Sequence, residues 1–163
     1  MGYVEASKTI NASVYAVWNT LNDIENTPKW VVGLERAEVS TEGAYGENTI
    51  YNDYNRLGPF LQVTTWHIVE FEPVVRQAHL SDSHTLPSLM TLNLSPEGER
   101  TRLTMTVEYR FLPRWGAISE VFERLVMNHM LKSVLTQNMT QLDRYLQKEI
   151  HRVRSTQEMW WVR

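Results

Sequence analysis

The feature that most constrains this chain is a long C-terminal stretch without proline or glycine. After Pro113 and Gly116 neither residue recurs, and from about residue 117 to residue 150 the sequence is typical of a single helix. Such a helix is about 50 Å long, which is enough to cross a whole sheet. One side of it is apolar and the other is charged, so the helix must pack on another layer. The apolar positions include Phe122, Leu125, Val126, Met130, Leu131, Val134, Leu135, Leu142, Tyr145 and Leu146.

The segment before this helix is predicted to form a strand with one apolar face. Over residues 102–112 apolar residues alternate with polar ones, which is the two-residue period of a half-buried strand. Five more extended segments precede it, and the breaks between them, such as "EGAYGE" and "SPEGE", have the composition of turns. Short connections make successive strands antiparallel neighbours. The five segments are residues 34–41, 48–57, 61–72, 75–81 and 89–94.

The N-terminal part predicts one further strand and two short helices. Residues 3–10 alternate as a strand does, and Ser13 is placed to cap a helix that follows. Because Pro28 disfavours the helical conformation for the residue before it, Trp30 belongs to a second short element with its own direction. The residues that recur at helical spacing in the first helix are Val14, Val17, Trp18 and Leu21.

The domain organisation is expected to be simple. We predict one domain over residues 1–150 and a C-terminal tail over residues 151–163. The tail combines basic residues with large apolar ones, which a surface groove, a lipid interface or a partner subunit, as in a homodimer, would cover. An unstructured end is the alternative. The residues concerned are Arg152, Arg154, Met159, Trp160 and Trp161.

Composition excludes several classes of function. The formal net charge is −3 with both signs mixed along the chain, so no basic surface for nucleic acid is expected. The absence of cysteine excludes thiol nucleophiles, thiolate metal sites and disulfides. No apolar run is long enough to span a bilayer and no secretory signal precedes the first strand. We therefore expect no transmembrane segment and take the cytoplasm as the expected compartment.

Three motifs resemble a known family. "INASVYAVWNTLNDIENTPKW" resembles the opening of the polyketide cyclase/dehydrase-like branch of the START/Bet v 1-like (SRPBCC) superfamily. "VEFEP", residues 69–73, resembles the branch's turn into the fifth strand, and "RTRLTMTVEYRF" resembles its last strand. The resemblance extends to about residue 150, and one departure is Thr27, where the family often has an aromatic residue.

The resemblance implies an α+β helix-grip fold. In that fold a seven-stranded, curved antiparallel sheet wraps around the long C-terminal helix, and two short helices after strand 1 close one end. A cavity remains between the sheet and the helix. In this arrangement Trp18 and Trp30 would hold the two short helices against the sheet, mainly as core residues.

The same resemblance suggests which residues line the cavity. Methionine suits a surface that adapts to irregular apolar ligands, although it also fills gaps in ordinary cores. On the strand over residues 48–57, Tyr51 and Asp53 share one side while Tyr54 and Arg56 share the other, and a position at the rim or on the solvent face is the alternative. The candidate ligand-binding residues are Tyr51, Tyr54, Trp66, His67, Met90, Leu92, Met105, Val107, Tyr109, Met127, Met130, Leu131 and Val134.

No strong catalytic or metal-binding motif is present in the sequence. His79 and Asp82 would face opposite ways on one strand and His84 falls in the following loop, so the spacing argues against a metal site. We expect no cofactor. If the cavity catalyses a reaction, a polar residue must reach the ligand and act as a general acid or electrostatic stabiliser. The candidates are Tyr51, Tyr54, Arg56, His67 and His79.

Three functions remain open at this stage. The first is binding of a hydrophobic or aromatic small molecule, lipid-like or polyketide-like, in the cavity between sheet and helix. The second is a polyketide aromatase/cyclase or dehydrase that acts in the same cavity. The third is a protein-binding module that uses the outer surface of the sheet or helix.

Overall fold

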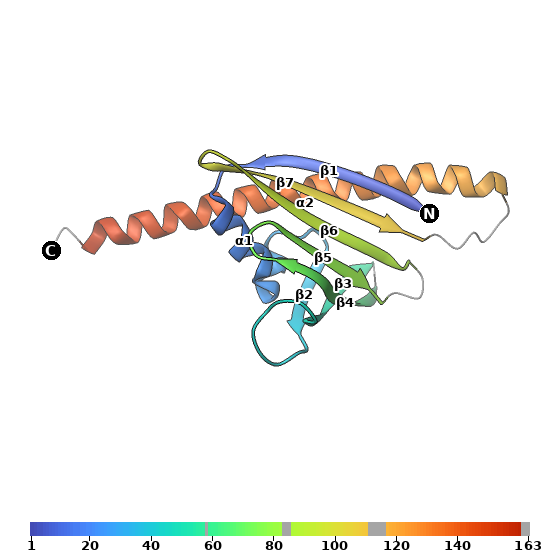
Figure 1. Cartoon of the computed structure of the whole chain (residues 1–163), viewed down its shortest axis with the longest axis horizontal. Helices are drawn as coiled ribbons and strands as arrows, with labels where there is room; N and C mark the ends of the chain where they lie inside the picture. The colour runs from blue at the N-terminus through green and yellow to red at the C-terminus, as the bar shows by residue number, and fades with distance from the viewer. Residues whose placement is uncertain (58, 83–85, 111–116, 161–163) are drawn as a thin grey trace.

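The computed structural model describes residues 1–57, 59–82, 86–110 and 117–160. It contains one seven-stranded antiparallel sheet and the long helix α2 (Ala117–Trp160), which runs along one face of the sheet (Figure 1). The strand order is β1-β7-β6-β5-β4-β3-β2. The strands are β1 (Gly2–Ile10), β2 (Leu34–Val39), β3 (Ile50–Leu57), β4 (Phe60–Glu72), β5 (Arg76–Ser81), β6 (Ser88–Glu97) and β7 (Arg100–Tyr109).

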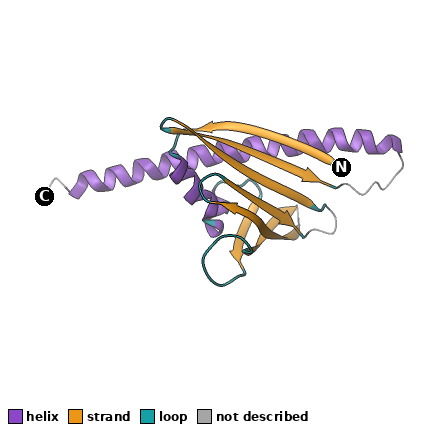
Figure 2. Cartoon of the chain, viewed as in Figure 1, coloured by secondary structure: helices purple, strands orange, loops and turns teal. Residues whose placement is uncertain are grey.

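The order of the strands along the chain explains their order in the sheet. From β2 to β7 each strand pairs with the next one along the chain, as short turns require, and β1 then pairs with β7. The expected α+β helix-grip fold is therefore confirmed, and Figure 2 shows the sheet as one layer with the long helix behind it. Most strand limits lie within a few residues of the prediction. The expected end of the last strand, Phe111 and Leu112, lies outside the described residues.

Two short helices follow β1, as predicted. Helix α1 (Val14–Asn22) begins at Ser13, whose hydroxyl accepts a hydrogen bond from the Ala16 amide at 3.3 Å. The second is the 3₁₀ helix η1 (Ile24–Lys29), and Trp30 follows it directly. Both helices pack apolar residues on the sheet. The Trp18 ring lies 5.1 Å from that of Phe71 on β4, and Trp18 and Trp30 are both buried core residues.

The long helix differs from the prediction at its C-terminal end. It continues to Trp160 instead of ending near Ile150. The sequence after Ile150 contains no glycine or proline to stop a helix, and Arg152 forms an ion pair at 2.8 Å with Glu149 within the same helix. The tail side chains Met159, Trp160 and Trp161 lie outside the part of the structure whose side chains are described.

The buried face of α2 is narrower than the apolar stripe of the sequence. Its core-facing line runs through Leu135, Met139, Leu142 and Leu146, which pack with the inner faces of β1, β6 and β7. Leu125, Val126 and Met130 were expected on that face but are exposed, and Val134, which lines the pocket described below, is 38% exposed. Met130, which is 52% exposed, precedes Leu131 by one residue and is therefore turned about 100° away around the helix axis. The side chain of Phe122 lies outside the described part.

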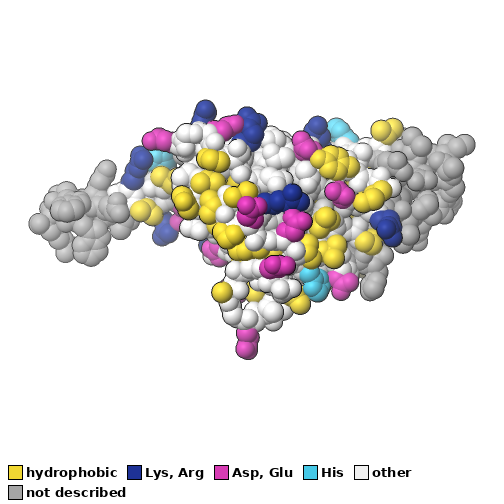
Figure 3. All heavy atoms as spheres, in the orientation of Figure 1, with side chains coloured by type: hydrophobic (Ala, Val, Ile, Leu, Met, Phe, Trp, Pro, Cys, Tyr) yellow, Lys and Arg dark blue, Asp and Glu magenta, His cyan; other side chains and the backbone are white. Residues whose placement is uncertain are grey.

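The outer surface of the sheet shows no single chemical character. In Figure 3 hydrophobic side chains on this face lie among lysine, arginine, aspartate and glutamate side chains. Ion pairs such as Arg36–Glu38 at 2.6 Å and Arg76–Glu70 at 2.8 Å join neighbouring positions there. Exposed pairs of this kind contribute little to stability. The apolar interior between the sheet and α2 therefore holds the fold together.

Candidate ligand-binding pocket

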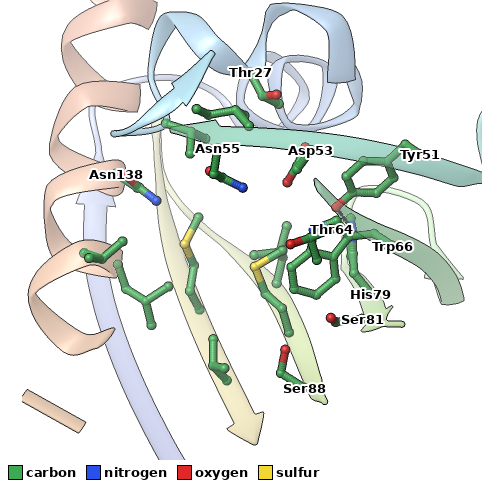
Figure 4. A pocket seen from close by; sticks show the side chains of 18 of the residues that line it. Thr27, Tyr51, Asp53, Asn55, Thr64, Trp66, His79, Ser81, Ser88 and Asn138 are labelled. Atoms are coloured by element: carbon green, nitrogen blue, oxygen red, sulfur yellow. Dashed lines mark hydrogen bonds between the residues drawn. The ribbon is translucent and has the colours of Figure 1, made fainter. Parts of the chain in front are cut away.

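A pocket of about 350 Å³ lies between the inner face of the sheet, η1 and α2. Its walls are mainly apolar, and Figure 4 shows the few polar side chains that reach it. Strands β6 and β7 supply the apolar floor, since the cross-strand neighbours Met90–Val107 and Leu92–Met105 all line the pocket. Helix α2 adds Leu131, Val134, Leu135 and Asn138.

Strand alternation explains which polar residues enter the pocket. On β3, Tyr51, Asp53 and Asn55 lie at every second position and all line the pocket. Their partners on β4 in the antiparallel register are Trp66, Thr64 and Gln62, and these line the pocket as well. The prediction that Tyr51 and Asp53 share one side of the strand is confirmed. Tyr54 and Arg56 face the other way, where Arg36 covers the Tyr54 ring at 4.0 Å and Glu35 pairs with Arg56.

Asp53 is a carboxyl group in an apolar setting. Burial raises its pKa from 3.8 to about 7, and the nearby indole N–H of Trp66 offsets a part of this effect by lowering the pKa. Among the described lining residues there is no lysine or arginine that would stabilise the carboxylate. With a pKa of about 7, Asp53 takes up a proton near neutral pH, so it can donate a hydrogen bond as well as accept one.

Tyr51 and His79 form a buried pair beside Asp53. The Tyr51 hydroxyl lies 2.7 Å from Nδ1 of His79, which is only 2% exposed. Burial lowers the pKa of His79 from 6.5 to about 4 and raises that of Tyr51 well above 10, so both groups are neutral near pH 7. The hydroxyl of Tyr51 has no other acceptor among the described residues, so it donates to Nδ1. Nε2 of His79 then carries the imidazole proton.

Three buried nitrogen atoms of the pocket lining have no hydrogen-bond partner in the described part of the protein. They are Nε1 of Trp30, Nε1 of Trp66 and Nε2 of His79. A buried donor without a partner costs about 1–3 kcal/mol, so such groups are uncommon in ordinary cores. Tyr51 contacts the His79 ring, and the rings of Tyr51 and Trp66 stack with 6.5 Å between their centroids at one end of the pocket. Figure 4 places Tyr51, Asp53, Trp66 and His79 together there.

The structure brings most of the candidate residues from the sequence to the pocket. Those that line it are Tyr51, Trp66, Met90, Leu92, Met105, Val107, Leu131 and Val134. The others lie elsewhere. His67 follows Trp66 on β4 and so has the opposite orientation, whereas the buried Tyr109 donates its hydroxyl to Oδ1 of Asn128 at 2.7 Å. Met127 is half-buried against the core cluster and Met130 is exposed.

Several lining residues were not proposed as site residues from the sequence. They include Thr27, Asp53, Asn55, Thr64, Ser81 and Asn138. For Asp53 a signal was available, because an acidic residue two positions after Tyr51 must share its face. No such signal exists for Asn138, which sits on α2 and whose Oδ1 accepts a hydrogen bond from the Val32 amide at 3.0 Å. Thr27 is buried, and its hydroxyl donates to the Ile24 carbonyl at 2.6 Å.

Two other features of the described residues bear on function. No three of their histidine, aspartate and glutamate side chains come together in a way that could hold a metal ion. His84, whose spacing from His79 and Asp82 argues against a metal site, lies outside the described residues. None of the described helices is both long and apolar enough to cross a membrane.

Comparison with known structures shows the same fold in several proteins. TTHA0849 from Thermus thermophilus is 20% identical, with a TM-score of 0.67 over 86% of this chain and 96% of that one. The Zhui aromatase/cyclase from Streptomyces sp. R1128 is 16% identical, with a TM-score of 0.71 over 91% and 94%. Ara h 8.0201 is 13% identical, with a TM-score of 0.67 over 90% and 97%.

The sequence itself shows the family. No curated protein matches the chain significantly. A family described as polyketide cyclase/dehydrase and lipid transport matches residues 1–147, which is nearly the whole chain. The resemblance seen in the three sequence motifs is thereby confirmed. This protein belongs to the polyketide cyclase/dehydrase and lipid transport family.

Proposed function

We propose that this protein binds a hydrophobic or aromatic small molecule, lipid-like or polyketide-like, in the pocket between the sheet and α2. The observation that carries the proposal is a pocket of about 350 Å³ with mainly apolar walls and a few polar groups at one end. Ligand pockets typically combine these properties, because apolar walls supply affinity and a few polar groups fix orientation. The name of the family, which includes lipid transport, supports the same class of ligand.

In this proposal residues 1–150 act as a single binding domain. The pocket draws its lining from α1, η1, every strand from β2 to β7 and the middle of α2, between Leu21 and Asn138. The last turns of α2 contribute no described lining residue. Removal of residues 151–163 is accordingly expected to leave ligand binding intact.

The first test looks for a ligand directly. Native mass spectrometry and solvent extraction of the purified protein should reveal a retained apolar molecule. A panel of neutral lipids and polycyclic aromatic compounds should also change the tryptophan fluorescence and raise the melting temperature, because Trp30 and Trp66 line the pocket. If nothing is retained and no compound in the panel changes either signal, the proposal is wrong.

A second candidate function is catalysis in the same pocket, as a polyketide aromatase/cyclase or dehydrase. The specific observation that favours it is the group of Asp53, Tyr51 and His79 inside an apolar cavity, where a general acid can polarise a carbonyl group. Of the residues that the sequence offered for catalysis, Tyr51 and His79 line the pocket, whereas Tyr54, His67 and Arg56 do not.

A linear poly-β-keto thioester tests this second function. A cyclised or dehydrated product, formed by the wild type and lost in Asp53→Asn and Tyr51→Phe, would support catalysis. Tyr54→Phe is the matched control, because Tyr54 lies on the same strand but outside the pocket lining. Binding of the thioester without any conversion would leave the protein as a binding module.

A further inference from the structure

The polar end of the pocket offers hydrogen-bond donors that the described residues do not use. The indole N–H of Trp66 and the Nε2–H of His79 are buried and have no acceptor among them. The Tyr51 hydroxyl donates its proton to Nδ1 of His79, and neither N–H completes a hydrogen bond to a described residue. The indole N–H of Trp66 lies near Asp53 without completing a hydrogen bond in this structure.

The charge of the lining argues against an anionic ligand. Among the described residues of the pocket, Asp53 is the acidic member, and neither a lysine nor an arginine is present to pair with a ligand carboxylate or phosphate. An anion would enter an apolar cavity without a cationic partner and beside a carboxyl group, at a large desolvation cost. Fatty acids and phospholipid head groups are therefore poor fits.

The unpartnered N–H groups of Trp66 and His79 also favour a ligand with a neutral hydrogen-bond acceptor over a cationic ligand. An ammonium group could pair with the Asp53 carboxylate, but it carries no acceptor of its own for the N–H groups of Trp66 and His79. A carbonyl oxygen has two lone pairs and can accept from two donors at once. Such an oxygen matches the unpartnered groups that the structure shows, and protonated Asp53 adds a third donor nearby.

We infer that the ligand carries an uncharged hydrogen-bond acceptor of the ketone or quinone type, which binds at the end of the pocket formed by Trp66, His79 and Asp53. The inference rests on the proposed function, because it assumes that the pocket takes up an apolar molecule. It adds the chemistry of the polar group and the place where this group binds. The apolar part of the ligand then lies against Met90, Met105 and the neighbouring aliphatic side chains.

Four naphthalene probes of similar size test the inference. Acetylnaphthalene carries a ketone, isopropylnaphthalene replaces it by a hydrocarbon group, naphthoate is an anion and naphthylethylamine is a cation. At about pH 6, where Asp53 is mostly protonated, the ketone should bind about tenfold more tightly than the hydrocarbon, which is the effect of one to two net hydrogen bonds. Naphthoate and the amine should bind more weakly than the ketone.

Two variants locate the interaction. Trp66→Phe keeps an aromatic ring but removes the N–H, so the preference for the ketone over the hydrocarbon should fall several-fold while hydrocarbon binding changes little. Asp53→Asn keeps a donor of similar size, so the preference should remain. Tyr54→Phe is the matched control on the outer side of β3 and should leave the preference unchanged.

A change of pH adds an independent readout. The titratable groups around Asp53 are Tyr45, Tyr51 and His79, and the pKa values of the two tyrosines are raised far above neutrality while that of His79 is lowered to about 4. Among these groups only Asp53, with a pKa of about 7, changes its charge between about pH 6 and pH 8. The ketone preference of the wild type should therefore fall at pH 8, whereas that of Asp53→Asn should not.

The outcomes separate this inference from the proposed function. Equal binding of ketone and hydrocarbon would leave pocket binding intact and show that the inference is wrong. Tightest binding of the amine or of naphthoate would also overturn it, because a charged group would then be the preferred partner. If none of the four probes binds, the inference is wrong, and the proposed function fails with it only if the wider panel of lipids and polycyclic compounds also gives no signal.

Discussion

Asp53 carries an ionisable carboxyl group that is buried in a mainly apolar pocket. An aspartate in the middle of a strand normally faces water, yet β3 alternation places this one beside Tyr51 in the pocket. Burial raises its pKa from 3.8 to about 7. The folded protein therefore holds the proton more strongly than the unfolded chain does. The stability that this proton contributes is present below about pH 4 and is lost as the pH rises through 7.

Asp53→Asn should consequently become more stable relative to the wild type as the pH rises. The expected change between about pH 4 and pH 8 is at most about 4 kcal/mol, from the free energy per pKa unit. His79 has the opposite effect on stability at low pH, because its pKa is lowered, but it is present in both proteins and cancels in the difference. Urea unfolding at several pH values measures the effect. A difference that stays constant with pH would contradict the buried state of Asp53.

The bond between Tyr51 and His79 leads to a second prediction at this scale. Tyr51→Phe removes the hydroxyl and leaves Nδ1 of His79 buried without a donor, which should cost about 1–3 kcal/mol. Tyr54→Phe should change stability by less than about 0.5 kcal/mol, because its ring lies at the surface under Arg36. Chemical denaturation of the two variants under the same conditions provides the comparison. Equal losses would mean that the Tyr51–His79 bond contributes nothing specific.

Single residues also show how much of the candidate site can be predicted from the sequence. The two-residue period of a strand is sufficient to place Tyr51 and Asp53 on one face, and this was predicted. The period cannot say which face is inside a pocket, because both faces of β3 carry polar residues. The hydrogen bond to His79 joins residues 28 positions apart, so it depends on the β3–β4–β5 register that only the folded sheet defines.

At the scale of elements, the long helix was the most predictable part. Its start and continuity follow from the lack of glycine and proline. Its C-terminal end and the width of its buried face differ from the prediction. It continues past Ile150 to Trp160, because no glycine or proline after Ile150 stops it. The buried face of the helix is narrower than predicted, because apolar residues occur on more than one side of it. Periodicity alone does not tell which of these residues pack on the sheet.

The orientation of α2 can be tested with a pair of leucines. Leu142 is fully buried against the sheet, whereas Leu125 is 64% exposed. Leu142→Ala should destabilise the protein by about 2–5 kcal/mol, because it leaves a cavity in the core. Leu125→Ala should cost less than about 0.5 kcal/mol, as other surface changes do. Thermal unfolding measures both, and a larger loss for Leu125→Ala would show that the helix is rotated from the position described.

At the scale of the whole molecule, the pocket exists because the long helix and the sheet do not meet along their entire length. Side chains of Leu135, Met139 and Leu142 fill the space toward β1 and β7. Around Leu131, Val134 and Asn138 of α2, side chains from β3 to β7 line an open volume instead. A sequence specifies the strands and the helix, but the volume left between them depends on how all the side chains pack, which no local pattern encodes.

Met105→Trp tests most directly whether this volume binds a ligand. Met105 lines the pocket from β7, and the control Thr104→Val lies on the other face of the same strand, where Thr104 bonds to Ser7. The measurement is the binding of the neutral apolar dye N-phenylnaphthylamine, together with the melting temperature. We predict that Met105→Trp loses dye binding with little change in stability, while Thr104→Val still binds the dye. A loss of about 1–3 kcal/mol in Met105→Trp, with dye affinity equal to that of the wild type, would show that this site is close-packed core and does not bind a ligand.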